Sequence, residues 1–165
     1  MNRTSLLWVL FIAFILVLIL VVVNHHNQTT EYTPLQVIET ILFVSDSLEL
    51  DPCLALSICC RESRFKQNVR GGMGELGTYQ ILESTGRDLG YSVSDLKNLR
   101  LNVIAGCEYL KYCLAISDNN ISLAAASFNV GPRRIKQLGY VPSYCSEYVS
   151  DVLRLYQACN EEMNQ

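Results

Sequence analysis

The strongest constraint on this chain is a run of 18 apolar residues, Leu6–Val23, that contains no charged residue, Gly or Pro. As a helix the run would span about 27 Å, close to the hydrocarbon thickness of a bilayer, with its backbone polar groups bonded internally. A cleaved secretory signal is the alternative, but such signals have a shorter apolar core and a small-x-small cleavage site. We therefore predict an uncleaved transmembrane anchor at residues 6–23.

The residues that flank the run predict its orientation. Arg3 precedes it, and no Lys or Arg follows until Arg61. By the positive-inside rule, residues 1–5 are cytoplasmic and the rest of the chain lies outside, in the periplasm or cell wall, or at a virion membrane if the chain is viral. Residues 24–32 are polar and read as a tether, which leaves residues 33–160 as an outer domain.

Charge and cysteine usage limit the partners and cofactors of that domain. Thirteen basic and 16 acidic residues give a net charge of -3, which excludes a nucleic-acid binder that works by neutralising phosphates. His25 and His26 alone do not make a metal site, and we predict no metal. Disulfides and small buried hydrophobes both remain open for the seven cysteines, which are Cys53, Cys59, Cys60, Cys107, Cys113, Cys145 and Cys159.

Helix start and stop signals recur along the outer domain. Thr33 followed by Pro34, with Gln36 three residues after Thr33, is typical of a capped helix start. No strand alternation or internal repeat accompanies these signals, so the predicted fold is mainly α, a single compact helical domain. The predicted helices begin at Pro34, run from Pro52 to about Ser63, Leu101 to Ile116, Ile121 to about Asn129, Pro132 to Gly139 and Ser143 to about Cys159, and also begin at Ser94 and Asn98.

A carboxylate, Glu62, stands at the end of the otherwise apolar helix that starts at Pro52. The negative end of the helix dipole and partial burial both disfavour its charged form, and a raised pKa suits a general acid at neutral pH. The alternative is an exposed Glu62 paired with Arg61 or Arg64. The nearby Gly-x-Gly-x-x-Gly at 72–77 follows a helix instead of a strand, so we predict no nucleotide cofactor.

Four short motifs follow one another in the outer domain: Glu-Ser at 62–63, Gly-x-x-Gly-x-x-Gln-Ile at 74–81, Asn-x-x-x-Gly-x-x-Tyr-Leu at 102–110 and Ala-x-Phe-Asn-Val-Gly-Pro at 126–132. In this order the chain resembles the soluble lytic transglycosylase (SLT) family, whose fold is lysozyme-like, of the goose type and the α+β lysozyme superfamily. The resemblance extends from about Leu35 to Tyr156.

This resemblance implies cleavage of the β-1,4 bond between N-acetylmuramic acid and N-acetylglucosamine in peptidoglycan glycan strands. Glu62 matches the family residue that acts first as acid and then as base, leaving a 1,6-anhydromuramyl end, with no cofactor. A lysozyme-type hydrolase on the same fold and a non-enzymatic peptidoglycan-binding scaffold protein remain alternatives. Secretion, conjugation, wall remodelling, and phage entry or release would each use such local lysis.

Other candidate site residues carry over from the same motifs. Gln80 matches the family Gln that lines the saccharide cleft, with a buried structural amide as the alternative. Asn129 matches the Asn of the fourth motif, although it could equally cap its own helix. Tyr79 is placed either to stack on a sugar face or to fill the core.

Three departures from the family pattern concern the same cleft. Phe128 stands where the family has a Tyr that contacts the catalytic Glu, which implies the loss of one hydrogen bond to Glu62. Gly71 stands at a position that is often Ser. Glu75 adds a carboxylate that could bond the loop, raise the pKa of Glu62, or position a water and so favour hydrolysis. The basic residues 133–136 could meet anionic wall polymer or lipid, or form a solvated helix face.

Overall fold

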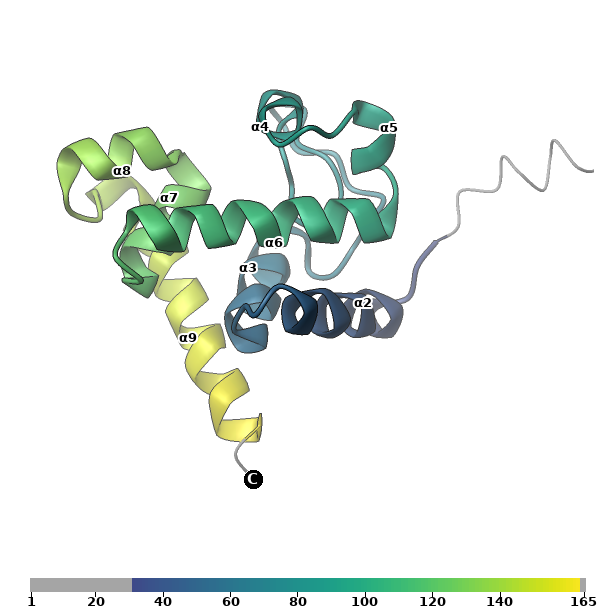
Figure 1. Cartoon of the computed structure of the whole chain (residues 1–165). Helices are drawn as coiled ribbons and strands as arrows, with labels where there is room; N and C mark the ends of the chain where they lie inside the picture. The colour runs from purple at the N-terminus through teal and green to yellow at the C-terminus, as the bar shows by residue number, and fades with distance from the viewer. Residues whose placement is uncertain (1–30, 164–165) are drawn as a thin grey trace, which may run out of the picture. The chain divides into compact units, whose positions relative to one another are not determined.

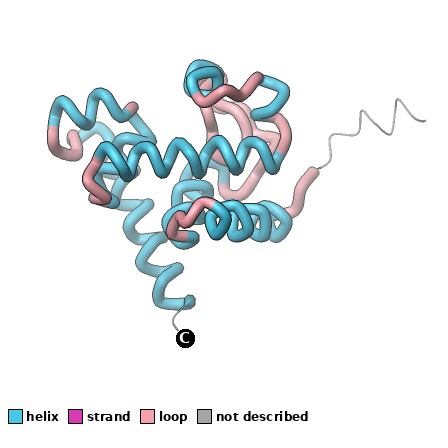
Figure 2. The backbone as a smooth tube through the Cα atoms, viewed as in Figure 1, coloured by secondary structure: helices cyan, strands magenta, loops and turns pink. Residues whose placement is uncertain are grey.

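The computed structural model describes residues 31–163, which form eight α-helices and one short 3-10 helix (Figure 1). Figure 2 shows the same path without a strand, and the isolated β-bridges within these residues join Arg70 to Leu76 and Leu76 to Ile81. The prediction of a mainly helical single domain is confirmed. The elements are α2 (Pro34–Ser47), α3 (Pro52–Ser63), α4 (Glu83–Asp88), α5 (Val93–Leu96), α6 (Leu99–Ile116), α7 (Ile121–Val130), α8 (Pro132–Leu138), η1 (Ser143–Cys145) and α9 (Ser146–Met163).

The predicted anchor at 6–23, the cytoplasmic end at 1–5 and nearly all of the tether lie outside the described residues. Among the helices of residues 31–163, none combines the length and the hydropathy that a membrane span requires. The part of the chain from Tyr32 onward forms one compact unit.

Side-chain caps set the beginnings of four of the predicted helices. Thr33, Asp51, Asn98 and Asn120 each accept a hydrogen bond from the third backbone N–H of α2, α3, α6 and α7. These N–H groups have no partner within their helix, so each cap stabilises its helix by about 1 kcal/mol. The capping box predicted for Thr33 and Gln36 is confirmed.

Several predicted boundaries are wrong by a few residues. Helix α6 begins at Leu99 instead of Leu101, and α5 begins after its cap Ser92 instead of at Ser94. The last predicted helix divides into η1 and α9, which ends at Met163. The short helix α4 carries no side-chain cap and therefore lacked a sequence signal.

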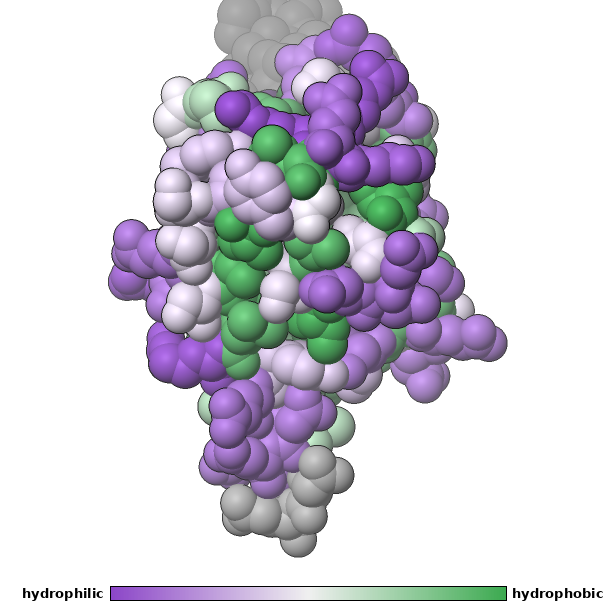
Figure 3. Space-filling view, turned by 90° about the vertical axis from the view of Figure 1, so that its left-hand side faces the viewer, coloured by the Kyte–Doolittle hydropathy of each residue, from purple (hydrophilic) through white to green (hydrophobic). Residues whose placement is uncertain are grey.

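Helix α6 runs through the middle of the domain (Figure 1), and its inner face supplies much of the core. Helices α2, α5 and α7 pack against α6, while α9 packs against α3 and α7. Seen from the side of α7, α8 and α9, hydrophobic side chains gather in the middle of the face and hydrophilic ones surround them (Figure 3). The packing of α9 on α3 brings the C-terminal helix against the helix that carries Glu62.

A disulfide between Cys53 and Cys159 joins the start of α3 to the C-terminal half of α9. The two cysteines are 106 residues apart in sequence, so the bond restricts a long loop of the unfolded chain. The other five cysteines are free thiols, of which Cys59, Cys107, Cys113 and Cys145 are buried. Both interpretations of the cysteines therefore hold, one for the disulfide pair and one for the buried thiols.

Candidate active site

The predicted site residues converge on a cleft of about 440 Å³. Glu62 reaches it from the last turn of α3, Glu75 and Gln80 from the loop between α3 and α4, and Phe128 and Asn129 from the end of α7. Segments that are far apart in the sequence thus line one space. Tyr79 is the one candidate that the structure does not bring to this cleft.

Glu62 is largely removed from solvent, and burial raises the pKa of its carboxyl to about 7. The nearby negative charge of Glu75 adds to the rise, whereas a hydrogen bond from Tyr148 and the charge of Arg61 lower the pKa. The dominant cause is the cost of charging a carboxyl in a site that water reaches poorly. A carboxyl with a pKa near 7 is able both to donate and to accept a proton at neutral pH.

The hydroxyl of Tyr148, from α9, donates a hydrogen bond of 2.6 Å to Oε1 of Glu62. Phe128 does lack a hydroxyl, but Glu62 has a phenolic donor from another element. Sequence reasoning assigned no role to Tyr148, and its only signal was that it falls within the stretch that resembles the family. The ring of Tyr148 is buried, so its hydroxyl is fixed in place.

The exposed ion pair that was the alternative for Glu62 is wrong. Nε of Arg61 lies 3.0 Å from Oδ2 of Asp151. Its guanidinium also lies over the ring of Tyr148, 5.2 Å from the ring centroid. Arg61 therefore contacts Asp151 and Tyr148 of α9, and it does not form an ion pair with the Glu62 carboxyl in the cleft.

Glu75 fills the space that a side chain at residue 71 would need. A Cβ atom on Gly71 would collide with Oε2 of Glu75, and the same oxygen accepts a hydrogen bond of 2.9 Å from the backbone N–H of Met73. The expectation that Glu75 bonds the loop is confirmed. Glycine at residue 71 thus leaves free the space that the Glu75 carboxylate occupies.

Gln80 is both a cleft residue and a structural amide. Its Nε2 donates to the carbonyl oxygens of Val69 and Gly77, at 3.2 and 2.7 Å, which ties the side chain to the loop. Its backbone has a φ of 47°, a left-handed conformation that is costly for a residue with a side chain. The surrounding loop holds Gln80 in that conformation at the edge of the cleft.

Tyr79 fills the core and does not face the cleft, so the interpretation as a core aromatic is confirmed and that as a sugar-stacking residue is wrong. Its side chain is 0% exposed, and its hydroxyl donates to the carbonyl oxygen of Ala55 at 3.0 Å. The ring fits against Gly106 so closely that a Cβ atom there would overlap it. Asn102 accepts the Tyr79 backbone N–H at 2.9 Å. The third motif therefore serves to seat Tyr79 and the loop that carries Gln80.

Asn129 lies exposed beside the cleft in the last turn of α7. The alternative role of helix cap is wrong, because α7 ends at Val130 and its C-cap is Gly131 with a φ of 94°. Within residues 31–163, no group of three or more His, Cys, Asp or Glu side chains is arranged to hold a metal ion.

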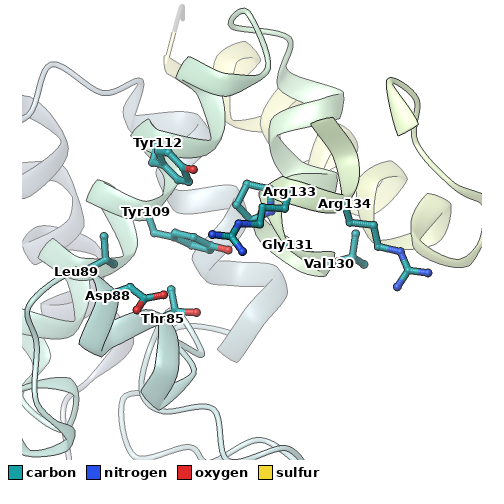
Figure 4. A pocket seen from close by; sticks show the side chains of 10 residues that line it. Thr85, Asp88, Leu89, Tyr109, Tyr112, Val130, Gly131, Arg133 and Arg134 are labelled. Carbon is teal, nitrogen blue, oxygen red and sulfur yellow. The ribbon is translucent and has the colours of Figure 1, made fainter. Parts of the chain in front are cut away.

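A second pocket, of about 630 Å³, adjoins the cleft (Figure 4). Residues from α4, α6 and the start of α8 line it. The two pockets have lining residues in common, so they form a continuous groove. The shared residues are Thr85, Tyr109, Val130, Gly131 and Arg134.

Comparison with known proteins relates this chain to one family. The family model described as the transglycosylase SLT domain matches residues 39–142. The fold is similar to that of an inactive mutant of the lytic transglycosylase Slt from Pseudomonas aeruginosa, with a TM-score of 0.67 and 22% identity over 76% of this chain. It is also similar to the 70 kDa soluble lytic transglycosylase from Escherichia coli, with a TM-score of 0.64 and 24% identity over 72% of this chain.

A complex of the 70 kDa soluble lytic transglycosylase with bulgecin A is similar too, with a TM-score of 0.69 and 21% identity over 77% of this chain. The matched region is 24% of the Pseudomonas aeruginosa chain and 23% of the Escherichia coli chain. The similarity therefore concerns one domain of those longer proteins.

Proposed function

The chain belongs to the transglycosylase SLT domain family, and from this premise we propose that it is a membrane-anchored peptidoglycan lytic transglycosylase. The bond that it would cleave is the β-1,4 bond from N-acetylmuramic acid to N-acetylglucosamine. The observation that carries the proposal is the Glu62 carboxyl, whose pKa is raised to about 7 by burial in a cleft beside Gln80 and Asn129.

Glu62 is the proposed catalytic residue, first as acid and then as base. The protonated carboxyl gives its proton to O4 of the leaving N-acetylglucosamine as the bond from that oxygen to C1 breaks. The N-acetyl group of the substrate stabilises the charge at C1. The carboxylate then takes the proton of the C6 hydroxyl while O6 bonds to C1. This sequence returns Glu62 to its protonated form, consumes no water and yields the 1,6-anhydro end.

Tyr148 is the proposed positioning residue for that carboxyl. Its hydroxyl holds Oε1 of Glu62, so we assign Oε2 to the proton that moves to and from the substrate. A donor to the carboxylate also stabilises the charged state in which Glu62 must act as a base. The remaining cleft residues, Gln80, Phe128 and Asn129, are assigned to binding of the glycan strand.

A lysozyme-type hydrolase is the second candidate, and Glu75 is the observation that favours it. Glu75 supplies a second carboxylate in the same cleft as Glu62. Inverting glycosidases use such a pair, one residue as acid and the other to activate a water. We favour the transglycosylase because Oε2 of Glu75 is already engaged by the N–H of Met73 and packs beside Gly71.

The non-enzymatic alternative rested on Phe128 and Gly71. In this chain Tyr148 donates to Glu62, and Glu75 fills the space beside Gly71. Tyr148 therefore supplies the hydrogen bond that Phe128 cannot, and Glu75 supplies a polar group where Gly71 has none. Both observations support an enzyme.

The proposed location is a membrane, with the domain on the extracytoplasmic side. The apolar run at 6–23 supports the anchor, and the Cys53–Cys159 disulfide is typical of an oxidising compartment. A tethered domain acts only near its membrane, as local lysis by a secretion, conjugation or phage entry or release machine would need.

The proposal is tested with the full chain in detergent and purified peptidoglycan sacculi. We expect the chain to solubilise the sacculi and Glu62→Gln to abolish this activity. Glu39→Gln, an exposed change on α2 outside the cleft, is the matched control and should keep it. Full activity of Glu62→Gln would contradict the proposal.

A further inference from the structure

The side chain of Arg61, which precedes Glu62 in the last turn of α3, reaches across to α9. Its Nε is removed from solvent and lies 3.0 Å from Oδ2 of Asp151, in an ion pair. Its guanidinium lies over the ring of Tyr148, 5.2 Å from the ring centroid. Tyr148 and Asp151 are three residues apart in α9 and share one face of that helix. One arginine of α3 therefore contacts two neighbouring side chains of α9.

These contacts close a ring that includes Glu62. The hydroxyl of Tyr148 returns to α3 and donates to Oε1 of Glu62 at 2.6 Å. Arg61 and Glu62 are adjacent in the chain, so the backbone of α3 joins the two ends of the ring. A displacement of α9 along α3 would disturb the ion pair, the ring contact and the hydrogen bond together. The position of the phenolic hydroxyl is therefore coupled to Arg61.

A surface charge at a helix end does not explain this arrangement. A basic residue in the last turn of a helix interacts favourably with the helix dipole, and Lys would do so as well as Arg. The side chains of Arg61 and Asp151 are 37% and 36% exposed, and ion pairs this accessible contribute at most about 1 kcal/mol to stability. A planar guanidinium differs from an ammonium because it stacks on an aromatic ring while its N–H groups face a carboxylate. The contacts of Arg61 use both properties.

The surrounding charges make Arg61 relevant to the ionisation of Glu62. Asp151 also faces Arg154, whose Nη2 lies 3.8 Å from Oδ1 of Asp151. Arg61 and Tyr148 both lower the pKa of Glu62. Arg61 therefore favours the carboxylate that acts as base, by its charge and through the bond from Tyr148. The other titratable groups that face Glu62 or Tyr148 are Glu75 from the loop and Cys113 from α6.

We propose that Arg61 is a positioning residue for the acid–base reaction: paired with Asp151, it holds the ring of Tyr148 so that the phenolic hydroxyl stays on Oε1 of Glu62. The inference rests on the proposed function and adds to it a residue that does not touch the substrate. Arg61 does not line the cleft, so it acts on the reaction through Tyr148 and through its charge.

Arg61→Lys tests this role, because it keeps the charge and removes the planar group. The pKa of Glu62 is measured by carbon-13 NMR of the labelled carboxyl in the full chain in detergent, with Glu62→Gln to identify the signal. We expect Arg61→Lys to raise this pKa by at most the one unit or so expected of Tyr148→Phe. In the Tyr148→Phe background the same change should leave the pKa nearly unmoved, because the hydroxyl is already absent. The rate of sacculus cleavage should fall roughly tenfold with Arg61→Lys, and no further in that background.

Asp151→Asn removes the partner of Arg61 from the other side and decides the question where Arg61→Lys does not fold. It should raise the pKa of Glu62 more in the original chain than in Tyr148→Phe. Arg154→Gln is the matched control, since Arg154 is a 72% exposed cation beside the same carboxylate. It should leave both the pKa of Glu62 and the cleavage rate unchanged.

The NMR measurement separates this proposal from the proposed function. A Glu62 pKa that Arg61→Lys leaves in place, or that it moves equally with and without the Tyr148 hydroxyl, would overturn the positioning role. An effect of Arg154→Gln as large as that of Arg61→Lys would do the same. If the pKa changes as expected but the original chain never cleaves sacculi, the role of Arg61 toward Tyr148 and Glu62 stands and the proposed function fails.

Discussion

Tyr148 donates a hydrogen bond of 2.6 Å to Oε1 of Glu62 although 86 residues separate them. The contact exists because α9 packs along α3, and the Cys53–Cys159 disulfide ties the same two helices together. The C-terminal helix therefore orients the carboxyl on which the proposed chemistry depends.

Tyr148→Phe removes a hydrogen bond that lowers the pKa of Glu62. The pKa should rise by about one unit, the scale of a hydrogen bond to a charged group. Since the acid step needs protonated Glu62, the loss of kcat/KM at high pH should move to higher pH, while kcat falls because the carboxyl is less well oriented. The pH profile of sacculus cleavage checks this, and an unshifted profile would contradict the positioning role.

Glu75→Gln should move the same profile in the opposite direction. The charge of Glu75 raises the pKa of Glu62, so its removal lowers that pKa and shifts the loss of activity to lower pH. The matched control Glu39→Gln should leave the profile in place. A shift to higher pH would show that Glu75 acts on Glu62 in another way, and an unmoved profile would show that the two carboxyls are not coupled.

Glu62→Gln should stabilise the fold at alkaline pH. The pKa of Glu62 is about 7 in the folded chain against an ordinary value of 4.5. Below pH 4.5 Glu62 is protonated in both the folded and the unfolded state, so its ionisation does not change the free energy of unfolding. As pH rises toward 7 the unfolded state gives up its proton first, and stability falls by at most about 3 kcal/mol. Glu62→Gln has no ionisable group at this position, so its stability does not fall in this way as the pH rises.

Chemical unfolding at pH 4 and pH 8 measures this difference. The advantage of Glu62→Gln over the original chain should be small at pH 4 and large at pH 8. An advantage of the same size at both pH values would mean that burial does not perturb the ionisation of Glu62.

Gly71→Ser should destabilise the domain by about 1–3 kcal/mol, because its side chain would collide with Glu75. The double change Gly71→Ser with Glu75→Gly removes the collision with Glu75 but leaves the close approach to Oε1 of Gln80, so it should recover part of that loss. Thermal unfolding of both single variants and the double variant forms the double-mutant cycle. Additive losses would show that the two positions do not share one space.

The parts of the fold with local signals were predictable from the sequence. The caps at Thr33, Asp51, Asn98 and Asn120 mark their helices because each bond forms within one turn. Helix α4 begins at Glu83, and its N-cap residue Leu82 makes no side-chain cap, so the sequence carried no start signal for it. Candidate site residues were found where a motif carried them, and the cleft gathers Glu62, Gln80 and Asn129.

Contacts between distant elements were not predictable. Tyr148 meets Glu62 only because α3 and α9 pack together. Tyr79 is buried because Gly106, on α6, leaves room for its ring. The fit of Glu75 beside Gly71 depends on a side-chain orientation that no spacing specifies.

The proposal that Glu62 cleaves the strand as acid and then as base is tested most directly by digestion of sacculi in water enriched in oxygen-18. Mass analysis of the new glycan ends should show 1,6-anhydromuramyl groups without oxygen-18, and none at all with Glu62→Gln. Reducing ends that carry oxygen-18, or anhydro ends formed equally by the Glu62→Gln variant, would contradict the account.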